Sequence, residues 1–166
     1  MSRAAIHVIP WVLTVLGWVM DREAIQAALK SAHGAARSEL ALKEALHRLL
    51  DDKNAASAAE LLKEVAEEAT GALGVNARLL LGHAYRALGK RRTAVFTYQR
   101  VARRQPADDP AVIALIALVE IGDETVAKVA RQRLDEIQSD PNRPPAADLI
   151  AGGETLAALE DFFASE

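Results

Sequence analysis

The sequence has 166 residues, of which 51% are hydrophobic, only 4% are aromatic and 26% are charged, with a formal net charge of −3. A chain of this length has room for one domain, or for a small domain with an appended segment, and this excludes two catalytic domains. The dominance of Ala and Leu predicts an all-α fold, and the absence of cysteine excludes disulfides, thiolate zinc sites and thiol nucleophiles.

The first element is an apolar run from Ala4 to Met20, which contains no formal charge and no alternation of polar and apolar faces. As a helix it would reach roughly 25 Å, near the short limit for a hydrocarbon core of about 30 Å. Trp11 and Trp18 lie seven residues apart on one stripe of this helix. We therefore expect residues 1–20 to form an uncleaved, single-pass membrane anchor with these tryptophans facing the membrane.

Two alternatives remain for the apolar run. One is a cleaved signal peptide, although no small-x-small site closes the run, and the other is a soluble helix buried between neighbouring helices or protomers. Arg3 precedes the run, Asp21 and Glu23 follow it directly, and further basic residues come soon after. The expected location is a membrane, the bacterial inner membrane, with the soluble part on the periplasmic side.

From Asp21 onward, apolar-periodic runs alternate with short turn signals, and each run predicts a helix. We expect a connecting helix over residues 21–37, a repeat domain over 38–141, and a linker with a C-terminal capping helix over 142–166. Turn signals fall at residues 51–54, 71–74, 89–90, 106–110, 122–123 and 140–145. Ser57 with Glu60, Asp109 before Pro110, and Asp123 are the predicted helix caps.

Small and aromatic residues recur with a period of roughly 34 residues, the length of a helix-turn-helix repeat. The strongest copy contains, in order, Gly82, Tyr85, Gly89, Ala94, Tyr98 and Pro106. This pattern closely resembles a tetratricopeptide repeat. The resemblance implies an α-solenoid of about three hairpins, in which residues 75–108 are flanked by weaker copies at about 40–74 and 109–140.

The segment from Glu154 to Ser165 has Leu156, Leu159, Phe162 and Phe163 on one side and acidic residues on the other. An amphipathic helix of this kind is what the end of a repeat array needs to cover its last apolar face. We therefore expect this segment to be the C-terminal capping helix.

No arrangement of residues in the sequence predicts catalysis. The four histidines, His7, His33, His47 and His83, form no HExxH motif, and none is expected to have a second His or a carboxylate at the helical spacing that would make a pre-formed metal site. Adjacent acids such as Asp51 and Asp52 diverge around a helix and are interpreted as solvated. We therefore predict that the protein is not an enzyme and has no catalytic residue, no metal site and no cofactor.

The charge distribution is uneven. Residues 75–107 carry eight Lys or Arg and no acid, whereas residues 108–166 carry thirteen Asp or Glu and four Lys or Arg. The basic residues are Arg78, Arg86, Lys90, Arg91, Arg92, Arg100, Arg103 and Arg104. They either lie against the acidic third of the same chain or face solvent, or they form a docking surface for an acidic protein segment or for lipid head groups. Nucleic acid is disfavoured because the whole chain is acidic and few aromatics interleave with the cations.

These observations predict a non-catalytic, membrane-anchored scaffold that mediates protein–protein interaction or complex assembly. The alternative is a structural accessory subunit of an integral membrane protein complex. The resemblance implies that first helices line the ligand surface, where Leu79 and His83 replace the Lys and Asn of domains that bind chaperone tails. The expected partner-binding residues are Leu79, His83, Arg86, Lys90, Arg91, Arg92, Arg103 and Arg104.

Overall fold

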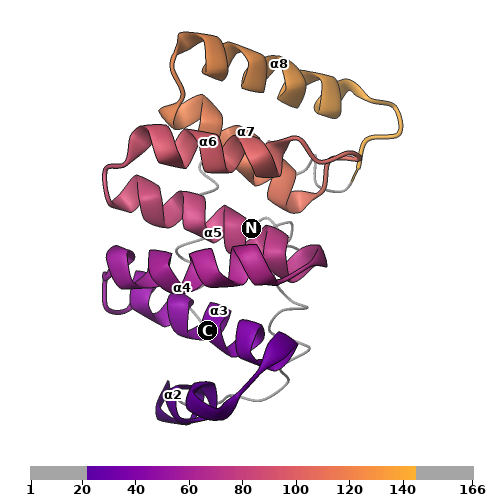
Figure 1. Ribbon diagram of the computed structural model, residues 1–166. Helices are drawn as coiled ribbons and strands as arrows, with labels where there is room; N and C mark the ends of the chain where they lie inside the picture. Colours follow the sequence, from indigo (N-terminus) through magenta and orange to yellow (C-terminus); the bar gives the residue numbers. More distant parts are fainter. Residues whose placement is uncertain (1–21, 145–166) are drawn as a thin grey trace. The chain divides into compact units, whose positions relative to one another are not determined.

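The computed structural model describes residues 22–144, and this part of the chain consists of seven α-helices without a β-strand (Figure 1). The all-α prediction is confirmed for these residues. The helices are α2 (Arg22–Ser31), α3 (Gly34–Leu50), α4 (Ala55–Glu68), α5 (Gly71–Ala87), α6 (Arg91–Ala102), α7 (Asp109–Ile121) and α8 (Glu124–Ser139).

Two predicted elements lie outside the described residues. They are the membrane anchor over residues 1–20, with Trp11 and Trp18, and the capping helix from Glu154 to Ser165. Among the helices of residues 22–144, none combines the length and the apolar character needed to cross a membrane.

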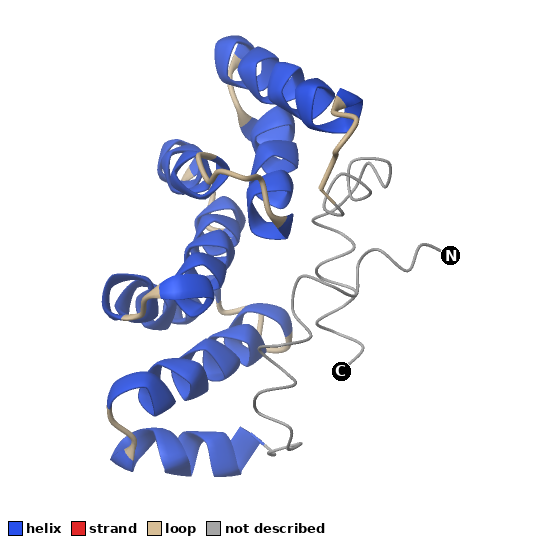
Figure 2. Ribbon diagram, turned by 90° about the vertical axis from the view of Figure 1, so that its right-hand side faces the viewer, coloured by secondary structure: helices blue, strands red, loops and turns tan. Residues whose placement is uncertain are grey.

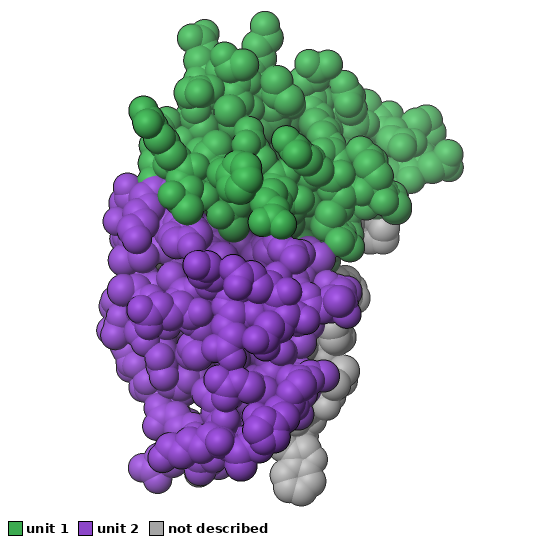
Figure 3. All heavy atoms as spheres, in the orientation of Figure 1, with its two compact units in different colours: residues 1–8, 91–166 green, residues 9–90 purple. Residues whose placement is uncertain are grey.

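The chain divides into two compact units, which Figure 3 shows in different colours. The described part of one unit contains α2 to α5, where α2 packs on α3, α3 on α4 and α4 on α5. The described part of the other contains α6 to α8, where α6 packs on α7 and α7 on α8. Short turns join the helices within each unit (Figure 2). This succession of helices is consistent with the expected tetratricopeptide-like α-solenoid.

The buried residues are mainly small and aliphatic, as the composition predicts. In α4 the buried face contains Ala58, Leu62 and Val65, which follow the helical spacing of three or four residues. In α7 every residue from Ala111 to Leu118 is buried, because this helix is apolar on all sides. Tyr98 of α6 has no exposed surface and is the largest fully buried side chain among the described residues.

Three helices begin at an Asn or Asp side chain that accepts a hydrogen bond from the third residue of the helix. The prediction for Asp123 is confirmed, since its Oδ1 lies 2.9 Å from the Val126 amide nitrogen. The predicted Ser57 and Asp109 caps are wrong. Asn54 caps α4 through the Ser57 amide at 3.1 Å, and Asp108 caps α7 through the Ala111 amide at 3.2 Å.

Two predicted boundaries also differ from the structure. The expected connecting helix over residues 21–37 ends at Ser31, and α3 already begins at Gly34 because His33 has an extended backbone that interrupts the helix. Residues 71–74 are the first turn of α5 rather than a loop. Gly74 is required there because an added Cβ would lie 2.3 Å from the carbonyl oxygen of Ala69.

The predicted turn at Gly89 is confirmed. Gly89 has a φ of +70°, which glycine adopts without steric cost. Its amide donates to the Arg86 carbonyl at 2.9 Å, and the Lys90 amide donates to the Tyr85 carbonyl at 2.9 Å. This pair of bonds satisfies the last carbonyls of α5 and ends the helix.

Candidate functional site

Three of the predicted partner-binding residues lie on one stripe of α5. Leu79, His83 and Arg86 are spaced by four and three residues, which places them on the same face of the helix. Leu79 is buried, whereas His83 and Arg86 are half-buried. The structure therefore places these three residues on one face of α5, with only His83 and Arg86 partly exposed.

Asn76 extends this stripe and was not predicted from the sequence. It precedes Leu79 by three residues and is only 6% exposed, and its Nδ2 has no hydrogen-bond partner among the described residues. A buried donor without an acceptor is unfavourable by about 1–3 kcal/mol, and a bound acceptor would remove that cost. The signal in the sequence was an isolated Asn in an otherwise apolar helical run.

Lys90 follows the turn that ends α5, and its side chain is exposed. Its Nζ lies 6.0 Å from the centre of the Tyr85 ring, at the outer limit of a cation–π contact. The ammonium group therefore remains available to solvent or to a partner.

Arg91 has a structural role that the partner-binding prediction did not include. Its Nε donates to the Ile121 carbonyl at 2.5 Å, and its Nη2 donates to the Gly122 carbonyl at 2.9 Å. These carbonyls end α7, where the helix leaves its last oxygens without internal partners and a cation is favourable. Arg91 therefore stabilises the end of α7.

Replacing Arg91 by alanine should lower the free energy of unfolding by about 1–2 kcal/mol, because two carbonyl oxygens lose charge-assisted hydrogen bonds. Arg92 is the matched control, since it is exposed and has no hydrogen bond or ion pair with the described residues. Replacing Arg92 by alanine should change the free energy of unfolding by no more than about 0.5 kcal/mol. Urea denaturation followed by circular dichroism measures both values, and equal losses would contradict this role of Arg91.

Arg103 and Arg104 lie at the opposite end of α6 from Arg91 and Arg92. Twelve residues separate the two pairs, which corresponds to about 18 Å along a helix. Arg104 pairs through Nε with Asp108 Oδ2 at 2.8 Å. Arg103 is exposed and has no hydrogen bond or ion pair with the described residues. Arg91 and Arg92 at the start of α6 and Arg103 and Arg104 just after its end therefore form two separate groups.

Several guanidinium groups bind uncharged backbone oxygens. Arg78 donates to the Ala66 carbonyl at 2.7 Å, and Arg91 binds the two carbonyls at the end of α7. A carbonyl satisfies a guanidinium group without cancelling its charge. The positive charge of Arg78 and Arg91 is therefore retained, whereas Asp108 neutralises Arg104.

An apolar groove lies between α6, α7 and α8 and was not predicted from the sequence. Its volume is about 320 Å³. The side chains that line it include Leu115, Leu118, Val126 and Val129, together with Arg103 and Arg133. The lining residues come from three helices and from Arg103 after α6, so no single segment of the sequence reveals the groove.

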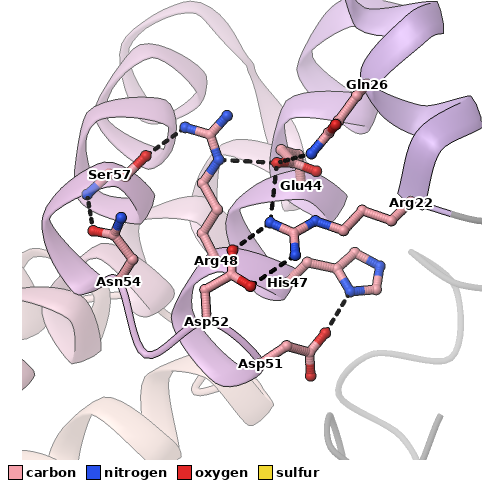
Figure 4. A network of polar contacts seen from close by, with 9 residues as sticks. All are labelled: Arg22, Gln26, Glu44, His47, Arg48, Asp51, Asp52, Asn54 and Ser57. Carbon is pink, nitrogen blue, oxygen red and sulfur yellow. Dashed lines mark hydrogen bonds and ion pairs between the residues drawn. The ribbon is translucent and has the colours of Figure 1, made fainter.

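A polar network joins α2, α3 and the turn after α3 (Figure 4). Its centre is Glu44, whose side chain is 1% exposed. Glu44 Oε1 accepts from Gln26 Nε2 at 3.1 Å and from Arg48 Nε at 2.9 Å, and it lies 3.7 Å from Arg22 Nη2. Because Arg22 and Gln26 belong to α2, the network fixes this helix against α3.

The network also corrects two predictions about the acidic pair Asp51 and Asp52. Asp52 binds Arg22 through both carboxylate oxygens, one of them at 2.7 Å, so it is not merely solvated. Asp51 Oδ2 lies 2.7 Å from His47 Nδ1, four residues away, so a histidine does pair with a carboxylate at helical spacing. Residues 22–144 contain no group of three or more metal-ligating side chains that could hold an ion.

The hydrogen bond from Arg22 lowers the pKa of Asp52 below its usual range. A carboxyl whose pKa is lower in the folded state stabilises the fold above its unfolded pKa, and this contribution is lost as the pH falls through the folded pKa. Replacing Arg22 by methionine should therefore reduce the loss of stability between neutral and acidic pH. Unfolding measured across this range checks the prediction, and identical pH profiles for both chains would contradict it.

Residues 49–119 match a family model described as tetratricopeptide repeat. The matched segment includes all of α4, α5 and α6 and most of α7, together with the Gly82 to Tyr98 pattern. Searches of curated proteins and of solved structures found no match. The matched segment is therefore similar to tetratricopeptide repeats, in agreement with the repeat pattern and the helical structure of residues 49–119.

Proposed function

We propose that the chain is a non-catalytic scaffold that binds a protein partner, or assembles a protein complex, through its helical repeats. Tetratricopeptide repeat domains generally bind protein partners, and the family match supports the same activity here. The observation that carries the proposal is the acid-free basic segment, in which Arg78 and Arg91 bind carbonyl oxygens and retain their charge.

The proposed partner contributes an acidic segment to the turn that contains Lys90 and Arg92. Both side chains are exposed, and neither has a hydrogen bond or ion pair with the described residues. Complementary charge accelerates association and selects among partners. Arg91 lies between them but stabilises α7, so a test of binding should leave it unchanged.

Photo-cross-linking in cells tests this proposal. A photoreactive amino acid at the exposed position Thr93 should capture a specific protein, and the double variant Lys90→Glu and Arg92→Glu should lose that product. The control, Lys128→Glu and Arg131→Glu, reverses the same number of exposed charges on α8 and should retain it. Loss of the product in both variants, or in neither, would contradict the proposed surface.

We further propose that residues 1–20 anchor this scaffold in a membrane, the bacterial inner membrane, with the repeats on the periplasmic side. The charge-free run from Ala4 to Met20 supports this part of the proposal. The full chain should stay with membranes under high salt and alkaline washing, whereas a chain starting at Asp21 should be soluble. Recovery of the full chain as a monomer without detergent would contradict the anchor.

The side of the membrane can be tested separately because the chain has no cysteine. A single Thr93→Cys variant should react with an impermeant maleimide in cells whose outer membrane has been opened. Labelling that requires lysis of the inner membrane would place the repeats in the cytoplasm.

The alternative function, a structural accessory subunit of an integral membrane complex, is favoured by exposed apolar side chains. Phe96 is 62% exposed and Val129 is 61% exposed. Permanent interfaces are more hydrophobic than transient ones and resist salt. A cross-linked partner that co-purifies unchanged at high salt would favour this alternative over the charge-dependent scaffold.

A further inference from the structure

The unit that contains α6, α7 and α8 has an open apolar surface. Val129, 61% exposed, lines the groove between these helices. Phe96, 62% exposed, precedes Gln99 and Arg103 of the groove by three and seven residues and therefore lies on the same face of α6. Exposed apolar side chains grouped around a groove are typical of a surface that another segment covers.

The charge at this groove is positive. Its lining contains Arg103 and Arg133 and no acidic residue. Arg133 donates to the carbonyls of Ala102 and Arg104, so its charge is retained. Arg103 is exposed and has no hydrogen bond or ion pair with the described residues. A segment that fits this surface needs apolar side chains for the floor and carboxylates for the two arginines.

The chain itself contains such a segment. Residues 154–165 carry Leu156, Leu159, Phe162 and Phe163 together with three acids, and residues 145–166 contain five acids and no basic residue. We propose that residues 154–165 bind as an amphipathic segment in the groove of α6, α7 and α8. Its leucines and phenylalanines cover the apolar floor, and its carboxylates face Arg103 and Arg133.

The connection is long enough for this contact. Residues 145–153 are nine residues, and an extended chain spans up to about 30 Å over that length. Val129 lies ten residues before the end of α8 at Ser139, a distance of about 15 Å along the helix. Because the segment and the groove belong to one chain, the local concentration of the segment reaches the millimolar range, so a weak contact is sufficient.

Disulfide cross-linking in the full chain tests the proposal. Because the sequence contains no cysteine, every disulfide must join two introduced cysteines. Val129→Cys is combined in turn with Leu156→Cys, Leu159→Cys or Phe162→Cys. Arg131→Cys, combined with the same three, is the matched control because it is exposed on the opposite side of α8. Disulfides require Cα atoms within about 7 Å, so they report direct contact. Circular dichroism confirms that each variant is folded.

At least one variant that combines Val129→Cys with a cysteine in residues 154–165 should form a disulfide within one chain. This reaction should be about tenfold faster than in the matching Arg131→Cys variant, because a bound segment has a higher local concentration at position 129 than a free segment. Adding Arg103→Glu should slow this reaction several-fold, since it replaces attraction by repulsion. Equal rates at positions 129 and 131 would overturn the proposal. Disulfides that join two chains would also overturn it, because a second copy would then occupy the groove.

Discussion

Replacing Tyr98 by alanine is expected to lower the free energy of unfolding by about 3 kcal/mol, because it is a large-to-small change in the core. Tyr98 has no exposed surface, and its neighbours on the same helix, Val101 and Ala102, are also buried. Truncation removes the whole ring from the core and leaves a cavity. Urea denaturation of a chain starting at Asp21, followed by circular dichroism, measures the loss.

Phe96 provides the control for this measurement. It is an aromatic residue of the same helix, only two positions away, but it lies at the surface and not in the core formed by α6, α7 and α8, since it is 62% exposed. Replacing Phe96 by alanine should therefore lower the free energy of unfolding much less than replacing Tyr98 by alanine. A loss below about 0.5 kcal/mol for Tyr98→Ala would show that Tyr98 is not a core residue and that the repeat register is wrong.

Replacing Arg48 by methionine is expected to destabilise the protein by about 3 kcal/mol, because it removes a donor from a buried carboxylate. Arg48 Nε lies 2.9 Å from Glu44 Oε1, and the Glu44 side chain is 1% exposed. Arg48 also donates to the Ser57 hydroxyl, so its loss weakens the packing of α4 against α3. Thermal or urea unfolding gives the magnitude.

A second substitution separates the charge from the packing. Adding Glu44→Gln to Arg48→Met should recover part of the loss, since the buried charge is then removed along with its partner. Arg104→Met serves as the comparison for an exposed ion pair, because Arg104 and Asp108 are 42% and 38% exposed. This substitution should lower the free energy of unfolding by less than about 1 kcal/mol. If the double variant were less stable than Arg48→Met alone, the uncompensated charge of Glu44 would not be the cause of the loss.

Features that depend on neighbouring residues could be predicted from the sequence. The turn at Gly89 and the cap at Asp123 are local, because each involves hydrogen bonds between residues at most five positions apart. The Ser57 and Asp109 caps were misplaced since Asn, Asp and Ser compete for the same role within a few positions. Periodicity indicates a helix but does not decide which of these side chains begins it.

Features that depend on residues far apart in the sequence were not predictable. Arg22 binds Asp52 across thirty residues, and Arg91 reaches Ile121 across thirty. The sequence shows both arginines only as charges, so Arg91 was assigned to partner binding and Asp52 to solvent. The α5 stripe of Leu79, His83 and Arg86 was predictable because it follows from helical spacing alone.

Association kinetics with the cross-linked partner test the central claim, a charge-dependent protein interaction, most directly. The association rate of the unaltered chain should fall steeply as the salt concentration rises, because long-range attraction is screened. The double variant Lys90→Glu and Arg92→Glu should associate about tenfold more slowly at low salt and depend less on salt. Equal rates and equal salt dependence for the two chains would contradict the claim.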